Sequence, residues 1–357
     1  MDQTKPDPTA IERRTMRKVS WRLMPFLILC YLIAYIDRAN IGFAALTMNA
    51  DLGLSSAAFG LGGSLVFVAY VLFEVPSNLA QQRVGARRWI ARIMISWGLV
   101  GLAMAFMAGP VSFWVLRFLL GAAEGGVFPG AVLFIAQWFP RAHRAGMVAL
   151  FMIAIPLSSA LGSPLAALLL SLDGMAGLAG WQWLFIIESI PALALGLIAL
   201  GVLSDGPGQA RWLTAEERDW LSRRLAEEGR ADRCGERIRA TALPLILTST
   251  ALFATLLTGS LAVTIVLLSL ALLGNCAIKG PFWALAAETL PPGLAAAGLA
   301  AINALAHLGT AAAIAAVGKI HGVTGSYPLA LVPLALMTLL GAGITLAPGR
   351  ARAGAPA

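Results

Sequence analysis

The chain has 357 residues, of which 59% are hydrophobic and only 12% are charged, whereas soluble domains carry about 25% charged residues. This composition excludes an ordinary soluble domain, because too few polar residues are present to cover its surface. The net charge of +8 does not indicate a nucleic-acid partner, because Lys and Arg cluster in the turns between apolar runs, as they do in membrane proteins.

The apolar runs predict ten membrane-spanning helices. Each run is about 20 residues or longer, apart from 241–257, which is short but could extend over 240–263. Each should be helical because hydrocarbon offers no partner to an unpaired backbone group. The expected spans are 22–46, 57–81, 89–109, 111–138, 145–171, 181–203, 241–257, 261–287, 294–318 and 328–347. We therefore expect an all-α polytopic membrane protein.

Basic residues predict the orientation of these spans. They gather in the N-terminal tail, in the turns after the second and fourth spans, in the loop at 204–240 and in the tail at 350–357. The alternate turns instead hold Asp51 and Asp173. By the positive-inside rule, both termini are expected in the cytoplasm. The expected location is a cytoplasmic (inner) membrane of the bacterial type.

The loop at 204–240 is the only sizeable polar segment before the C-terminal tail. Thr214 is followed three residues later by Glu217, which is the spacing of a capping box. We expect a short amphipathic helix on the cytoplasmic surface. It would link an N-terminal six-helix bundle (1–203) to a shortened four-helix bundle (241–349).

This layout is typical of transporters built from two six-helix halves. A basic turn, Arg83 to Arg88, follows the second span, and a similar turn, Asp232 to Arg237, precedes the seventh. If the two turns correspond, the second half lacks the two helices that should come before its turn. Losing two helices preserves the orientation of the C-terminus.

Several stretches together resemble the major facilitator superfamily, and in particular its organic anion/proton symporters. They are YLIAYIDRANIGFAAL, LFEVPSNLAQQRVGARRWIARIMISWG, RFLLGAAEGGVFPGAVLFIAQWFP, GLAGWQWLFIIESIPA and GPFWALAAETLPPGLAAAGLAAINALAHLG. The resemblance covers almost the whole chain. It implies a carrier for phthalate, tartrate, hydroxyphenylacetate, sugar acids or similar anions. The first basic turn departs from the superfamily form, with Asn78 and Gln82 in the usual Gly and Asp places.

Charged residues inside the spans are the candidate functional residues, because an ionisable group in the bilayer costs at least a few kcal/mol. Asp37 and Arg38 lie about 22 Å into the first span at 1.5 Å per residue. Arg117 and Glu124 lie on one face of the fourth span, about 10 Å apart. This separation is too long for a tight pair, so we expect Arg117 to meet Asp37 across the contact between the two helices.

These residues suggest a proton-coupled anion site. Asp37 and Glu124 are carboxyl groups that can take up and release a proton. Arg38 and Arg117 offer a two-pronged donor set for a substrate carboxylate. The resemblance implies the same roles for the matching residues. The alternative is a static charge cluster that holds the helices together.

Other polar residues are weighed separately. Asn40, one turn from Asp37, is a candidate for the cavity wall, as are Asn303 and His307 in the ninth span. The resembled family has Asn at the position of His307, so this histidine is either a titratable group or a drifted residue. Glu74 and Glu188 each lie near a proline, and we expect each to satisfy backbone groups freed there or to cap a basic loop turn.

We expect neither a metal nor another cofactor. The three cysteines (Cys30, Cys234 and Cys276) have no metal-site spacing, and the three histidines are scattered. The leading hypothesis is proton-coupled uptake of a small carboxylate; the expected partners are protons, this solute and membrane lipid. The alternative is a transport-inactive remnant, or an erroneous gene sequence, that lacks two helices. An enzyme is not expected, since no Ser–His–acid set or phosphate loop lies at a suitable depth.

Overall fold

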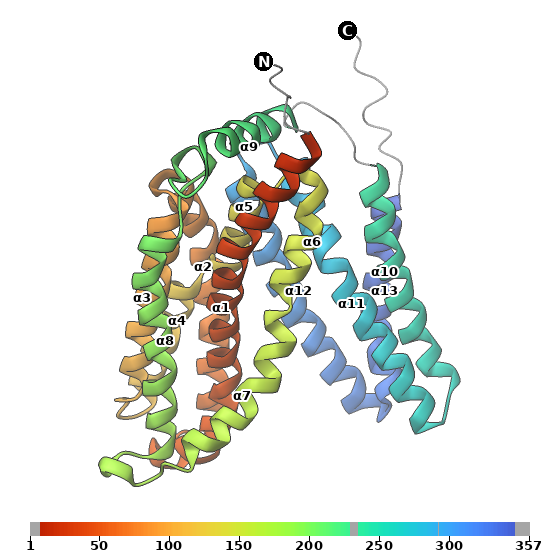
Figure 1. Cartoon of the computed structure of the whole chain (residues 1–357). Helices are drawn as coiled ribbons and strands as arrows, with labels where there is room; N and C mark the ends of the chain where they lie inside the picture. Colours follow the sequence, from red (N-terminus) through yellow and green to blue (C-terminus); the bar gives the residue numbers. More distant parts are fainter. Residues whose placement is uncertain (1–7, 229–234, 292, 347–357) are drawn as a thin grey trace, which may run out of the picture. The chain divides into compact units, whose positions relative to one another are not determined.

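The computed structural model describes residues 8–228, 235–291 and 293–346, and its regular structure in those ranges is entirely helical (Figure 1). The longer helices are α1 (Pro8–Asp51), α2 (Ser56–Val84), α3 (Ala86–Met104), α4 (Pro110–Glu124), α5 (Val127–Trp138), α6 (Arg141–Met152), α7 (Ala154–Leu170), α8 (Gly180–Val202), α9 (Ala215–Glu228), α10 (Gly235–Ala254), α11 (Leu261–Thr289), α12 (Ala295–Thr324) and α13 (Tyr327–Leu346). The expected tail at 350–357 and residues 232–234 of the second basic turn lie outside the described ranges.

Seven helical segments are long and apolar enough to cross a membrane. They are Ala10–Ala45, Ala57–Val84, Pro110–Trp138, Arg141–Leu170, Gly180–Val202, Leu261–Ala287 and Tyr327–Leu346. The apolar parts of α10 and α12 are shorter, at Thr241–Leu257 and Ala295–Thr310, and α3 carries three arginines in its first two turns. The described helices thus have the composition of membrane spans, while the expected number of ten stays a prediction.

The chain divides into two compact units. The first comprises Met1–Gly229 and Leu290–Ala304, and the second comprises Arg230–Thr289 and Leu305–Ala357. The first turns of α12 therefore belong with the N-terminal helices, and the rest of α12 belongs with α10, α11 and α13.

The first unit is a bundle built around α1. α1 packs against α7 and α8, α3 packs against α8 and α4, and α2 packs against α4. Large side chains with almost no exposed surface fill the contacts, among them Trp97, Phe113 and Phe134. Burying such side chains contributes about 1.5–3 kcal/mol each in water. Within a membrane, close packing replaces that term as the main source of helix association.

The fourth span is divided into α4 and α5 at Gly125 and Gly126. Gly126 has φ +96°, and a Cβ atom there would lie 2.7 Å from the side chains of Asn78 and Ser77 on α2. Only glycine combines this positive φ with so close an approach. The break therefore lets α2 pack directly against the end of α4, where Glu124 is the last residue.

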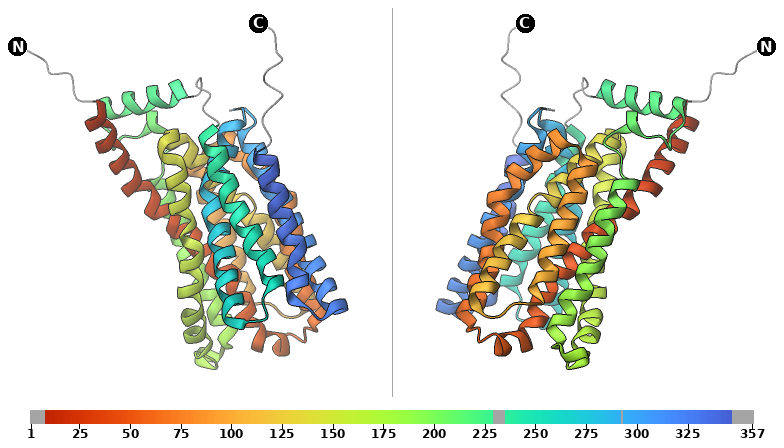
Figure 2. Two further views of the ribbon diagram at one scale, coloured as in Figure 1. Left: turned by 90° about the vertical axis from the view of Figure 1, so that its right-hand side faces the viewer. Right: turned by 90° about the vertical axis from the view of Figure 1, so that its left-hand side faces the viewer.

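α9 lies crosswise at the end of the first unit where α1 begins (Figures 1 and 2). The expected capping box is confirmed: the Thr214 N–H donates to Glu217 Oε2 at 2.9 Å, and the Glu217 N–H donates to Thr214 Oγ1 at 3.3 Å. The buried Glu217 carboxylate also accepts hydrogen bonds from Lys18 and Arg14 on α1. Burial raises the pKa of Glu217, but the hydrogen bonds from Lys18 and Thr214 outweigh this effect, so its pKa lies below the usual value.

The second unit is a smaller bundle in which α10 packs against both α11 and α13. Two hydroxyl groups of α10 join these helices. Thr248 donates to the Ala271 carbonyl on α11 at 3.3 Å, and Ser249 donates to the Ala335 carbonyl on α13 at 2.8 Å. Hydroxyl-to-carbonyl bonds of this kind are common between membrane helices.

Candidate functional site

An ion pair inside the first unit joins α1 to α4. Arg38 Nη2 lies 2.5 Å from Glu124 Oε1, and the Glu124 side chain is 6% exposed. The Arg38 guanidinium also lies over the rings of Tyr35 and Tyr70, at 5.3 and 5.4 Å from their centroids. Contact with aromatic faces stabilises a cation that has lost water. Arg38 and Glu124, which the sequence proposed for different roles, are thus direct partners.

Asp37 is held by a tryptophan of a third helix. Its Oδ2 accepts a hydrogen bond from Trp97 Nε1 on α3 at 3.0 Å, and both residues are buried. The sequence analysis did not single out Trp97. The signal was available, because a buried indole N–H in the middle of a span usually requires an acceptor, and Asp37 is a carboxylate in another span.

Arg117 is buried on α4, but the expected direct pair with Asp37 does not form in the described structure. No ion pair joins the two side chains, and Arg117 Nε has no hydrogen-bond partner. The charges of Asp37 and Glu124 nevertheless act on Arg117. The interpretation that the first and fourth spans share a charge cluster agrees with this arrangement, whereas the pairing within the cluster was wrong: Glu124 pairs with Arg38, and Asp37 is held by Trp97.

Asn40 and Glu188 meet where α1 contacts α8. Asn40 Nδ2 donates to Glu188 Oε1, and both side chains are buried. The sequence analysis expected Glu188 to satisfy backbone groups near Pro191. The described structure gives it Asn40 as its hydrogen-bond partner instead.

Asn303 and His307 lie one turn apart on α12. Asn303 belongs to the first unit, where its Nδ2 donates to Oε1 of the fully buried Glu74 on α2. Glu74 was also expected to serve the backbone near a proline, and it instead receives this amide. His307 belongs to the second unit and is partly exposed. That Asn303 and His307 line one cavity with the charged residues stays a prediction.

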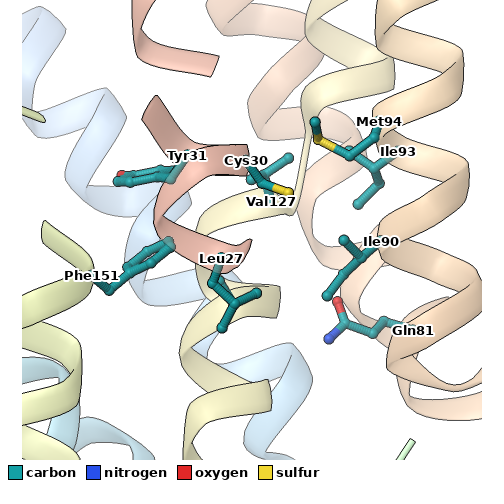
Figure 3. A pocket seen from close by; sticks show the side chains of 10 residues that line it. Leu27, Cys30, Tyr31, Gln81, Ile90, Ile93, Met94, Val127 and Phe151 are labelled. Atoms are coloured by element: carbon teal, nitrogen blue, oxygen red, sulfur yellow. The ribbon is translucent and has the colours of Figure 1, made fainter. Parts of the chain in front are cut away.

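The first unit contains a small cavity that is separate from these charges. Its volume is about 20 Å³, and its lining is almost wholly apolar. Figure 3 shows Tyr31 and Phe151 on one side and Gln81 and Ile90 on the other. A cavity of this volume holds about one water molecule, so it is too small for an organic solute. Among the described residues, no group of three or more His, Cys, Asp or Glu side chains is placed to hold a metal ion.

Comparison with known sequences connects the chain to transport proteins. The sequence model of the Major Facilitator Superfamily matches residues 27–230. A protein of Agrobacterium vitis called a putative tartrate transporter is 56% identical over 218 residues, which are 61% of this chain and 49% of the relative. The chain thus spans about half the length of this relative.

A second putative tartrate transporter of Agrobacterium vitis is 39% identical over 410 residues, covering 94% of this chain and 95% of the relative. That alignment is longer than the whole chain of 357 residues. The relative therefore contains a substantial number of residues that have no counterpart here.

A solved structure of the proton:xylose symporter XylE has a similar fold, with a TM-score of 0.70. The alignment covers 92% of this chain and 95% of the symporter at 14% identity. This likeness supports the architecture of the helices and carries no argument about the solute.

Proposed function

Because the chain belongs to the major facilitator superfamily, a family of transporters rather than enzymes, we propose that this integral membrane protein carries a small carboxylate together with protons. Alternating access would expose a central site to each side of the membrane in turn. A negative solute entering a negative cell moves against the membrane potential at about 2.3 kcal/mol per charge per 100 mV. Protons that enter with it offset this cost.

The Arg38–Glu124 pair is the observation that carries the proposal. The Glu124 carboxylate takes up one N–H group of Arg38 and neutralises the positive charge that would attract a second anion. Protonation of Glu124 would remove its charge and leave the N–H groups of Arg38 available to donate to a substrate carboxylate. Proton binding and anion binding would then favour one another at a single pair of side chains, which is the requirement for coupled uptake.

The other candidate residues take supporting roles in this proposal. Arg117 supplies a second positive charge near Asp37 and Glu124, and Asp37 is a second proton-coupling carboxyl group. Asn40, Asn303 and His307 are proposed as wall residues of the solute site. The carboxylate class is supported by the names of the relatives, since both Agrobacterium vitis proteins are called tartrate transporters.

The membrane arrangement belongs to the same proposal. We infer ten spans, six in residues 1–203 and four in residues 241–349, with both termini in the cytoplasm and the chain in a bacterial-type inner membrane. The basic turns support this orientation, and the surface helix α9 would then lie on the cytoplasmic side.

A transport-inactive remnant is the second candidate, and a specific observation favours it. The full-length alignment with the second relative is longer than this chain, and the family match ends at residue 230, which is where two helices are expected to be missing. Without them, part of the wall around a central site would be open to lipid.

Uptake by proteoliposomes tests the proposal. Purified protein should take up radiolabelled tartrate faster when protons are more concentrated outside, and Glu124→Gln should abolish this dependence on the pH gradient. Glu227→Gln is a matched control, because Glu227 is an exposed glutamate of α9. Uptake that is equal with and without a pH gradient contradicts proton coupling. Folded protein without uptake of any carboxylate supports the remnant.

A further inference from the structure

The contact between Asn40 and Glu188 leaves two buried atoms without partners. Asn40 Nδ2 donates to Glu188 Oε1, but Asn40 Oδ1 and Glu188 Oε2 make no hydrogen bond. Asn40 has no exposed surface, and Glu188 is 5% exposed. A buried polar atom without a partner costs about 1–3 kcal/mol, so two at one contact call for an explanation.

The helices around Glu188 provide no cation for a carboxylate. Glu188 is the only ionisable residue of α8, and α7 contains none. On α1, Asp37 adds a second acidic group whose charge acts on Glu188, and Arg38 is paired with Glu124.

The third neighbouring helix, α3, does not supply a cation either. Arg87 and Arg88 lie in its first turn, and Glu188 is packed deep in the bundle. Arg92, the next arginine of α3, donates to Ser77 on α2 and lies over the ring of Trp89. An ionised Glu188 would therefore be a buried charge beside another acid, which is among the costliest arrangements in a membrane protein.

A protonated carboxylic acid resolves both difficulties. It has one O–H donor and one carbonyl acceptor, and a carboxamide has N–H donors and one carbonyl acceptor. The two groups can form a pair with two parallel hydrogen bonds: Asn40 Nδ2–H donates to Glu188 Oε1, and Glu188 Oε2–H donates to Asn40 Oδ1. This pairing satisfies both orphaned atoms and leaves no net charge.

We propose that Glu188 is a proton-binding site, occupied in this state, in which Asn40 recognises the neutral acid through two hydrogen bonds. The site lies at the contact of α1 with α8 and is separate from the Arg38–Glu124 pair. Protonation of Glu188 also affects Asp37, which lies one turn before Asn40. A neutral Glu188 places no second negative charge beside the Asp37 carboxylate. The inference concerns the protonation of the chain and does not depend on which solute is carried.

Infrared difference spectroscopy of the whole chain in liposomes at neutral pH tests this site. The spectrum of the wild type minus that of Glu188→Gln should contain the carbonyl stretch of one protonated carboxylic acid per chain. The same band should move to higher frequency in Asn40→Leu, because the acid loses its amide partner. Glu227→Gln is the matched control, because Glu227 is an exposed glutamate of α9, and this variant should leave the acid band in place.

Two results would overturn the proposal. In the first, Glu188→Gln removes a carboxylate band instead of an acid band, which means that Glu188 is ionised. In the second, the acid band keeps its wild-type frequency in Asn40→Leu, which means that Asn40 is not its partner. Neither outcome depends on uptake, so a failure here is distinguishable from a failure of proton-coupled transport.

Discussion

The two units share one pattern of helix packing but differ in what completes it. In the first unit, α3 packs against α8 and α4, and in the second, α10 packs against α13 and α11 in the same way. The first unit also has α1, which packs against α7 and α8, and α2, which packs against α4. In the described part of the second unit, the extensive helix contacts are those of α10 with α11 and with α13, and no helix takes these two places.

This comparison bears on the expectation that two helices are missing from the second half. α12 corresponds to α7 in chain order, and α7 is held to its bundle mainly by α1. A counterpart of α1 would be one of the two helices expected before the second basic turn. The loss of two helices would account both for the unequal packing of the units and for the longer alignment with the tartrate relative.

The units also differ in their polar contacts. The first buries carboxyl groups and a guanidinium within its spans, at Asp37, Glu124, Glu188 and Arg117. The bonds described between helices of the second unit are neutral, at Thr248 and Ser249. Among the described residues, the buried charged side chains therefore lie in the first unit.

Adding the two helices that are expected before the second basic turn should have the largest effect on uptake. A chimera that receives the two corresponding helices of the tartrate relative between Glu228 and Gly235 should take up tartrate faster than the natural chain. The reason is that the added helices would hold α12 and close the wall of the site. Uptake by proteoliposomes measures this. The same insertion in a Glu124→Gln background is the control and should remain inactive, and a natural chain that already matches the chimera would contradict the comparison.

Removing the cation beside the buried Glu124 carboxylate should have the next largest effect. Arg38→Met leaves Glu124 without its cation, and removing the partner of a buried charge costs about 3 kcal/mol. Lys279→Met is the matched control in the second unit, because Lys279 lies on α11 and is partly buried, as Arg38 is. Thermal unfolding in detergent should show a much larger loss for Arg38→Met. Equal losses of thermal stability in the two variants would mean that the ion pair of the first unit does not stabilise it more than a lysine of the second unit does.

The sequence predicted an all-helical chain and charged side chains inside its helices, because both follow from the hydropathy of each segment taken by itself. It did not predict which side chains pair with one another. Arg117 was assigned to Asp37 because both lie deep in facing spans, but the break at Gly125 and Gly126 ends α4 at Glu124, where that side chain meets Arg38. Such a pairing depends on the rotation of each helix, which periodicity alone leaves undetermined.

Glu74 and Glu188 show the same limit. Each lies near a proline, and local reasoning assigned it to the backbone there. The structure gives both an asparagine from a distant part of the chain, Asn303 and Asn40. Hydropathy identifies an asparagine within an apolar span but not the group that it meets on another helix, so contacts of this kind emerge only from the packed bundle.

Trp97 tests the difference between charged and neutral hydrogen bonds. Trp97→Phe removes the donor to Asp37, and a bond to a charged group contributes about 2 kcal/mol. Ser249→Ala removes a neutral bond of the second unit, with an expected cost of about 1 kcal/mol. Chemical unfolding of both variants in the same detergent measures the two losses. If Ser249→Ala is the more destabilising, the contrast between the units is wrong.

The smallest effect is expected at the surface of the first unit, where Glu217 joins α9 to α1. Its folded-state pKa is depressed, so its contribution is present above its unfolded pKa of about 4.3 and is lost as the pH falls through the lower folded value. Lys18 and Arg14 are about half exposed, which limits the contribution to at most about 1 kcal/mol. Glu217→Gln should therefore lower the melting temperature slightly at pH 7, and this loss should shrink as the pH falls below about 4.3, whereas the exposed Glu227→Gln should leave the melting temperature unchanged at either pH. A loss as large as that of Arg38→Met would mean that α9, and not the buried charges, holds this unit together.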